Sequence, residues 1–332
     1  MTTEPEIPVV SAKLNQFSEK KDEYQAIFIG SSRIYRHIVP SQFDRLMASQ
    51  GYPIQSYNFG VSGMTVPETH FVLQQILAMT PQNLEFVFLE LYDVNLLIDD
   101  QNLRTERVIY WHTWEHTLWI YQLLWLNVLN EKRNIVLNLK KIYSHTLPLL
   151  YNLTNLGQGD RWIRRILPPT EGVDTTLNPR GDTAYGTPGI DGYLALDDEP
   201  GPNFQKRHQE FLENLDTYHE KVQSITPTPE RRAAPTSDQL KAIEDLIKTV
   251  RDSGATPVFI ITPVLEKETH LIAAHTRGYI PLLFAFNDPI EFPTLYDENK
   301  RFDLDHLNHG GATEFSKLLA ERFSNYLDGE KN

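Results

Sequence analysis

Short apolar runs alternate along this chain with segments whose apolar residues recur at helical spacing. Four of the runs have the pattern of buried parallel strands that lead into turns, and they cover residues 25–30, 54–59, 85–91 and 256–262. Four segments read as helices, at residues 41–51, 65–77, 240–254 and 312–327. Thr65 and Glu68 have the spacing of a capping box at the start of the second helix.

This alternation predicts an α/β fold, a parallel sheet with helices on both of its faces. Ligands of such sheets sit beyond the carboxyl ends of the strands, and Ser31, Gly60 and Leu91 occupy such ends. Residues 101–235 break the rhythm and are rich in Trp, Tyr, Pro and Gly, so we read them as one long insertion. The α/β core then comprises residues 24–100 and 236–332, after an N-terminal extension of residues 1–23.

Composition narrows the possible partners. The chain has 332 residues, 40% hydrophobic and 23% charged, and a net charge of -13, with 31 basic residues that are scattered along it. No basic run marks a nucleic-acid or anionic-membrane site, so we expect no nucleic-acid partner. Cysteine is absent, which excludes disulfides and thiolate metal ligands and fits a reducing compartment.

The sequence as given shows neither a secretory signal nor an apolar run of about 20 residues, the length that a membrane-spanning helix needs. We therefore expect no integral membrane segment and a cytoplasmic location, or an exported protein if an export signal has been removed. Oligomerisation through the insertion is a further expectation.

Four separated segments carry candidate chemistry. In the first, Phe28-Ile-Gly-Ser-Ser-Arg33, a serine follows a strand and a glycine. It can present its hydroxyl at the edge of the sheet, with its own backbone N–H available to an anion. An ordinary helix cap is the alternative.

The second segment, Asn58 to Thr65, follows another strand, and its Gly63 N–H could donate to an oxyanion; a simple glycine turn is the alternative. In the third segment, Phe88 to Asn95, the amide of Asn95 could be a further donor or could cap a turn.

The fourth segment contains Asp303 and His306, three residues apart just before the last helix. The carboxylate can accept from one ring nitrogen while the other ring nitrogen faces a substrate, which is what the base of a serine nucleophile requires. A solvated surface pair is the alternative.

The order of these segments resembles that of the SGNH (GDSL-type) hydrolases, and is closer to their cell-envelope acyl-transfer and esterase branch. The resemblance implies a flavodoxin-like three-layer α/β/α sandwich and acyl chemistry through a covalent acyl-enzyme. It places the nucleophile on Ser32, with Ser31 as the second candidate, the base on His306 and its orienting carboxylate on Asp303.

Within the same resemblance, the oxyanion donors are Ser32, Gly63 and Asn95, although Asp93 competes for the place of Asn95. Residues expected to contact substrate are Ser31, Arg33, Asp93 and Asn308. The expected substrate is a small-molecule or carbohydrate ester, with no cofactor. Water as acceptor gives hydrolysis and a hydroxyl gives acyl transfer, while an inactive binding protein on the same fold is the third possibility.

Two features of the insertion have competing interpretations. Four tryptophans fall within fifteen residues: Trp111, Trp114, Trp119 and Trp125. They are interpreted as a lid or acyl-binding wall over the site, as the insertion's own core, or as a dimer contact. His112 and His116 have a zinc-like spacing without an obvious third ligand, so we expect two surface imidazoles and no metal.

Overall fold

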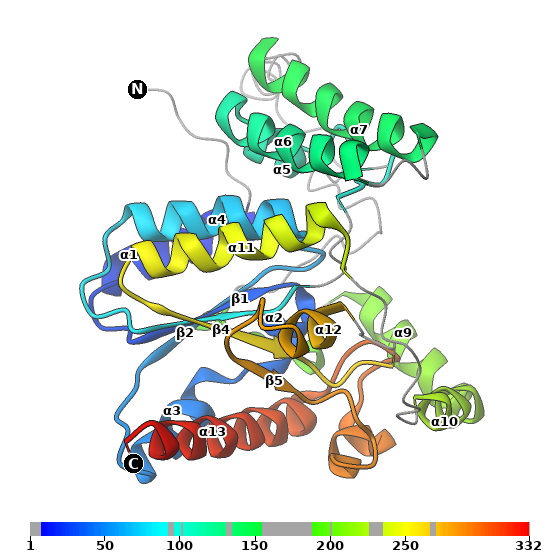
Figure 1. Cartoon of the computed structure of the whole chain (residues 1–332). Coiled ribbons are helices and arrows are strands. Elements are labelled where there is room, and N and C mark those ends of the chain that lie inside the picture. Colours follow the sequence, from blue (N-terminus) through cyan, green and yellow to red (C-terminus); the bar gives the residue numbers. More distant parts are fainter. Residues whose placement is uncertain are drawn as a thin grey trace, which may run out of the picture.

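Five parallel strands form the centre of the protein in the computed structural model (Figure 1). The structure describes residues 8–91, 96–100, 102–130, 135–154, 188–199, 201–225, 235–265 and 270–331. The strands are β1 (Ala26–Gly30), β2 (Ser56–Gly60), β3 (Phe86–Leu89), β4 (Thr256–Ile261) and β5 (Leu283–Ala285). Their order in the sheet is β2-β1-β3-β4-β5, which leaves the chemistry-bearing loops after β1, β2 and β3 side by side.

Helices cover both faces of this sheet. One layer consists of α1 (Pro8–Lys20), α4 (Val66–Ala78) and α11 (Ser237–Asp252), and the opposite layer consists of α2 (Ser32–His37), α3 (Pro40–Ser49) and α13 (His309–Lys331) (Figure 1). The α/β fold predicted from the sequence is therefore confirmed, and the arrangement is consistent with a flavodoxin-like three-layer sandwich.

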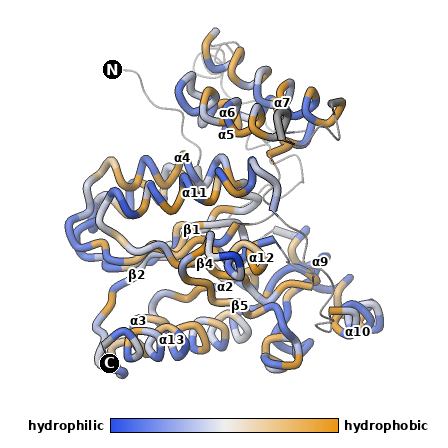
Figure 2. Tube along the Cα trace, viewed as in Figure 1, coloured by the Kyte–Doolittle hydropathy of each residue, from blue (hydrophilic) through white to orange (hydrophobic). Residues whose placement is uncertain are grey.

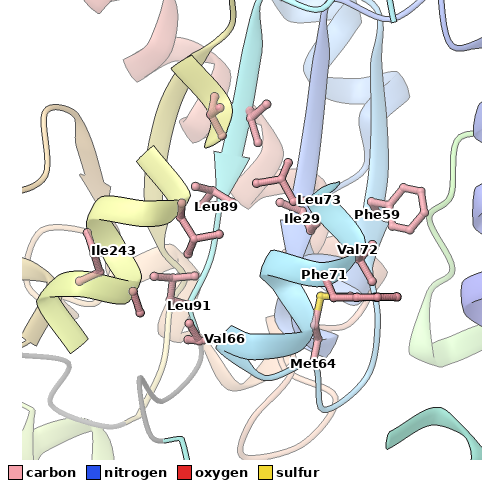
Figure 3. Packing of buried hydrophobic residues seen from close by; sticks show 14 of the residues in the cluster. Ile29, Phe59, Met64, Val66, Phe71, Val72, Leu73, Leu89, Leu91 and Ile243 are labelled. Carbon is pink, nitrogen blue, oxygen red and sulfur yellow. The ribbon is translucent and has the colours of Figure 1, made fainter. Parts of the chain in front are cut away.

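Alternation along β1 builds a core on each face of the sheet. Ile27 and Ile29 enter the cluster beneath α4 and α11, which Figure 3 shows in close view. Phe28 points to the other face and stacks on Phe88, with ring centroids 4.5 Å apart. All five residues of β1 are buried, as expected for a parallel strand covered on both faces.

The N-terminal extension includes α1, which packs on the β2 edge of the sheet. Phe17 of α1 is fully buried and stacks on Tyr24. Sequence patterns did not predict α1, β5 or α12 (His270–Thr276), because β5 is only three residues long and the apolar stripe of α1 is weak.

The predicted capping box at Thr65 is wrong. Thr65 is the N-cap of α4 but makes no side-chain capping hydrogen bond. The carboxylate of Glu68 instead pairs with Arg107, because the insertion brings a guanidinium over the first turn of α4.

The insertion contributes helices to two separate places. Helices α5 (Glu106–Trp111), α6 (Trp114–Asn130) and α7 (Ile135–Thr154) lie outside α4 and α11 (Figure 1), and Trp119 donates to Asp245 Oδ2 of α11 over 2.8 Å. Helices α9 (Pro202–Glu213) and α10 (Leu215–Ser224) lie near the loop that precedes α13. That loop follows two short 3-10 turns, η2 (Pro293–Tyr296) and η3 (Glu298–Lys300).

A segment of the insertion closes the β2 edge of the sheet. The Asn58 N–H donates to Asp191 O over 2.9 Å, and the buried ammonium of Lys13 donates to the carbonyls of Asn58 and Gly192 over 2.9 and 2.6 Å. Next to it, the 3-10 turn η1 (Leu196–Asp198) leads to Glu199, which pairs with Arg36 of α2 in full burial. The edge strand is thereby protected from pairing with other chains.

Candidate active site

The turn from β1 into α2 holds the two serines in different roles. Ser31 is buried and is the N-cap of α2, where its Oγ accepts from the Arg33 N–H over 3.2 Å. The Ser31 N–H donates to Glu90 Oε2 at the end of β3 over 2.8 Å. Ser31 therefore stabilises the turn, and Ser32 is left as the first residue of the helix.

Ser32, His306 and Asp303 form a continuous row of hydrogen-bonded groups. Ser32 Oγ lies 2.9 Å from His306 Nε2, and His306 Nδ1 lies 2.9 Å from Asp303 Oδ1 and 3.2 Å from Oδ2. The carboxylate thus fixes a proton on Nδ1, which leaves the lone pair of Nε2 facing the serine hydroxyl. The side chains of His306 and Asp303 are only 12% and 10% exposed, so the solvated surface pair is not what the structure contains.

The loop that carries Asp303 and His306 is fixed by its own backbone. Asp303 Oδ1 accepts from the backbone N–H groups of Asp305 and His306, each over 2.8 Å. Farther along, the Leu307 N–H donates to Nε2 of the buried His37 over 3.1 Å. His37 belongs to α2, so the helix that begins at Ser32 also holds the loop of its partner histidine.

Arg207 of α9 completes the environment of the carboxylate. Its guanidinium donates to Asp303 Oδ2, on the side away from the serine, and lies 3.4 Å from His306 Nδ1. Packing of Phe204 and Leu196 on Phe302 holds this part of the insertion against the loop.

Charge in this environment favours the ionised form of Asp303. Burial alone would raise its pKa, but the imidazole of His306, the guanidinium of Arg207 and backbone N–H donors together lower the pKa well below its usual value. Burial has the opposite consequence for His37, whose pKa falls well below that of a free imidazole. His37 is therefore a neutral structural acceptor, while Asp303 stays an anion.

The loop after β2 lies beside the serine because Gly60 and Gly30 are in register. The amide of Asn58 donates to the carbonyls of Ile34 and Ile38, each over 2.8 Å, which fastens α2 to β2. A side chain at Gly60 would place its Cβ 2.2 Å from the Tyr35 nitrogen, so glycine is needed for this close approach.

Two backbone donors are available at this end of the sheet. Gly63 has a left-handed conformation, with φ of +67°. Within the described residues, the N–H groups of Ser32 and Gly63 donate no hydrogen bond, as expected for oxyanion donors. Asp93 and Asn95 lie outside the described residues, so the structure does not place the third expected donor.

Of the residues expected to contact substrate, Ser31 and Asn308 have structural contacts. Ser31 caps α2, as described above. Asn308 Oδ1 accepts from the Gly311 N–H over 2.9 Å at the start of α13, and its amide donates to Asn299 O over 2.8 Å. Arg33 is buried within α2. The expectation that Asn308 faces the substrate is not supported by these contacts, because both ends of its amide are used by the loop.

The two histidines of zinc-like spacing are not surface residues, which corrects that expectation. His112 and His116 are both buried. His112 Nε2 lies 2.9 Å from Nδ1 of the buried His145 of α7, and His116 Nε2 lies 2.9 Å from Pro67 O. In the part of the chain that the structure describes, no group of three or more His, Cys, Asp or Glu side chains has the arrangement of a metal site.

Three site residues escaped the sequence reasoning. Arg207 is 96 residues from Asp303 in sequence, and no local pattern connects the two. Glu90 directly follows β3, and the pattern of its segment indicated only Asp93 and Asn95 as candidates. His37 lies five residues after Ser32 in a six-residue helix, which is too short for a periodicity signal.

Comparison with known proteins adds no assignment. No protein-family model matches the chain, and no curated protein matches it either.

Proposed function

We propose that this protein is a serine-dependent ester hydrolase that acts on an O-acyl group through an acyl-enzyme, as the resemblance to SGNH hydrolases implies. The observation that carries the proposal is the row Ser32–His306–Asp303, in which both hydrogen bonds are 2.9 Å long. An inactive scaffold has no need to keep a hydroxyl, an imidazole and a carboxylate in this geometry.

The reaction begins with proton transfer from Ser32 Oγ to His306 Nε2 as the oxygen attacks the ester carbonyl. The anion of Asp303 stabilises the imidazolium that forms. The backbone N–H groups of Ser32 and Gly63 donate to the oxyanion, and they need no reorganisation because no other group in the described residues occupies them.

Collapse of the tetrahedral intermediate returns the proton from His306 to the leaving alkoxide and leaves Ser32 acylated. Water then attacks the acyl-enzyme, with His306 again as the base, and releases the carboxylic acid. The expected substrates are small-molecule or carbohydrate esters. A sugar or alcohol hydroxyl in place of water would make the same residues an acyltransferase.

The test is hydrolysis of p-nitrophenyl acetate and longer p-nitrophenyl esters, combined with mass spectrometry of the quenched protein. Ser32→Ala and His306→Ala are expected to abolish turnover, and acetylation is expected on Ser32 only. Ser31→Ala is the matched control, since it removes a neighbouring hydroxyl and costs about 1 kcal/mol of capping stability but leaves the row intact.

Activity that is lost in Ser31→Ala and kept in Ser32→Ala would move the nucleophile to Ser31. A wild-type protein that folds, shows no turnover and forms no acyl-enzyme would refute ester hydrolysis. A protein that is acylated but turns over only when an alcohol or sugar is added would be an acyltransferase.

A further inference from the structure

Helix α7 presents apolar side chains to solvent and polar side chains to the protein interior. The exposed fractions along its outer stripe are 77% for Val136, 60% for Leu139, 56% for Tyr143, 50% for Leu150 and 54% for Leu153. The opposite side of the helix carries four buried polar residues, Asn138, Lys141, Ser144 and His145, together with the buried Pro148 and Leu149. Polar residues therefore predominate on the buried side, which is the reverse of a helix on the surface of a water-soluble protein.

Contacts of the buried polar side fix this orientation. His145 contacts His112, the residue that follows α5, and its Nε2 lies 2.6 Å from Leu96 O. The ammonium of Lys141 lies 3.7 Å from Asp238 of α11. Rotation of α7 to hide its apolar stripe would break these contacts and leave buried polar groups without partners, so the stripe stays outside.

Helix α6 enlarges the apolar surface of this part of the molecule. Trp114, Leu118 and Trp125 of α6 are exposed by 51%, 38% and 61%. Of the thirteen large hydrophobic side chains that are exposed in the described residues, nine belong to α6 and α7. Hydrophobic stretches along both helices are visible in Figure 2. An exposed apolar concentration of this kind marks an interaction surface.

Charged side chains are scarce on the same surface. Among the described exposed positions of α6 and α7, only Glu115 and Lys140 are charged. By contrast, the exposed positions of α11 are Glu244, Lys248, Arg251 and Asp252, all of them charged. The low charge is therefore a property of the α6–α7 pair and not of the helices of this protein in general.

We propose that the outer face of α6 and α7 docks on the surface of a phospholipid bilayer. Helices that contact hydrocarbon have this arrangement, with polar side chains facing the protein interior and apolar side chains facing outward. Exposed Trp and Tyr side chains match the membrane interface, where an apolar ring and a polar N–H or O–H are both satisfied. Helix α7 contains no acidic residue, so this helix adds no charge repulsion from phosphate headgroups.

The helices lie on the bilayer and do not cross it. No helix in the described part of the chain is long and apolar enough to span a membrane, whereas an amphipathic helix in the interface needs only one apolar face. A second copy of the chain is a poorer occupant, because each copy carries a net charge of -13 and like-charged copies repel. Docking is independent of the proposed ester chemistry.

Because the basic residues are scattered along the chain, binding to the bilayer should come from burial of apolar side chains and not from attraction to charged lipids. Vesicles of zwitterionic phosphatidylcholine should therefore suffice, and binding should persist in 0.5 M NaCl, where charge attraction is screened. The experiment is flotation of the full chain with such vesicles on a density gradient, together with analytical ultracentrifugation of the protein alone.

The decisive variant is the triple substitution Leu139→Gln, Tyr143→Gln and Leu150→Gln. These side chains are exposed, so the fold is expected to remain, and circular dichroism checks it. The vesicle partition coefficient of this triple variant should be at least about tenfold lower than that of the wild type. The matched control is Ile190→Gln, Leu212→Gln and Ile290→Gln, which removes three hydrophobic side chains exposed elsewhere and should float like the wild type.

Wild-type protein that does not float would overturn the proposal. So would flotation that the two triple variants lose equally, because adhesion would then be unspecific. Self-association of the wild type that only the α7 variant abolishes, without flotation, would assign the face to a second copy. Ser32→Ala should float normally, which separates lipid binding from any failure of the proposed catalysis.

Discussion

Arg207 donates a hydrogen bond to Asp303 from a helix that lies 96 residues earlier in the chain. The guanidinium contacts Oδ2, and Oδ1 of the same carboxylate is the atom nearest to His306. The guanidinium also lies 3.4 Å from His306 Nδ1. Arg207 therefore lowers the pKa of Asp303 and fixes its carboxylate beside the histidine.

Arg207→Gln should lower kcat/KM for p-nitrophenyl esters by about tenfold, because Asp303 loses the charged donor that fixes its carboxylate beside His306. The measurement is the rate of p-nitrophenyl ester hydrolysis, with a thermal melt to confirm the fold.

Arg207→Lys is the control for this prediction. Lysine keeps the charge but not the planar guanidinium, so Arg207→Lys should retain more activity than Arg207→Gln. If both variants lower kcat/KM equally, Arg207 serves only to pack α9 against the loop.

The fully buried ion pair of Arg36 and Glu199 gives a second prediction. Arg36→Met should lower the free energy of unfolding by about 3–5 kcal/mol, because it leaves the carboxylate of Glu199 buried without its charged partner. The double variant Arg36→Met, Glu199→Leu should be more stable than Arg36→Met alone, since it removes both desolvation costs.

Urea denaturation of the wild type, both single variants and the double variant measures this coupling. Additive losses would show that the two side chains do not depend on each other. The double variant should also keep esterase activity, because the pair lies at the far end of α2 from Ser32.

Gly192 gives a third prediction, which tests the segment that covers the β2 edge. Its φ is +81°, and a Cβ at this position would lie 2.1 Å from Asn58 O. Gly254 has a φ of +90° with no atom within 4 Å of its would-be Cβ. Gly254→Ala should therefore cost about 1–2 kcal/mol through backbone strain alone.

Gly192→Ala should cost at least about 2 kcal/mol more than Gly254→Ala, because the clash is with backbone and must displace the segment from Asn58. Denaturation midpoints of the two variants measure the difference. Equal losses would mean that residues 188–199 can move away from the sheet edge without cost.

Sequence patterns predicted four of the five strands and the segments that contain Ser32, Asp303 and His306, because each of these segments lies next to a strand or helix with a strong local signal. The choice of Ser32 over Ser31 came from the resemblance. Strand ends in a parallel sheet converge, so residues at the ends of β1 and β2 could be placed together without knowing the packing. An ordinary serine helix cap was the alternative at this turn, and Ser31 has that role.

Tertiary packing decided what local patterns could not. Glu68 had the spacing of a capping box, but Arg107 from the insertion gives its carboxylate a charged partner. His112 and His116 were expected on the surface because their spacing does not show their neighbours, which are His145 of α7 for His112 and the carbonyl of Pro67 in α4 for His116. Arg207 could not be found from the sequence, because it reaches Asp303 only through the packing of α9 against the loop that precedes α13.

Asp44 gives the last prediction, a dependence of stability on pH. Burial raises the pKa of this carboxyl to about 7, although hydrogen bonds from the Ser56 hydroxyl and N–H, over 2.5 and 3.0 Å, favour its ionised form. The ordinary value of an aspartate pKa is 3.8. The folded state therefore binds a proton that the unfolded state has already released, and this contribution to stability is lost as pH rises from about 4 through 7.

Between pH 5 and pH 8, the wild type should lose roughly 2 kcal/mol of stability on account of Asp44. Asp44→Asn keeps an oxygen for the Ser56 N–H and cannot ionise, so its stability should be flatter over the same range and should exceed that of the wild type most at pH 8. Urea denaturation at four pH values measures both curves, and the difference between them cancels the other titrating groups. Parallel curves would mean that the two Ser56 donors outweigh the cost of burial and keep Asp44 ionised at neutral pH.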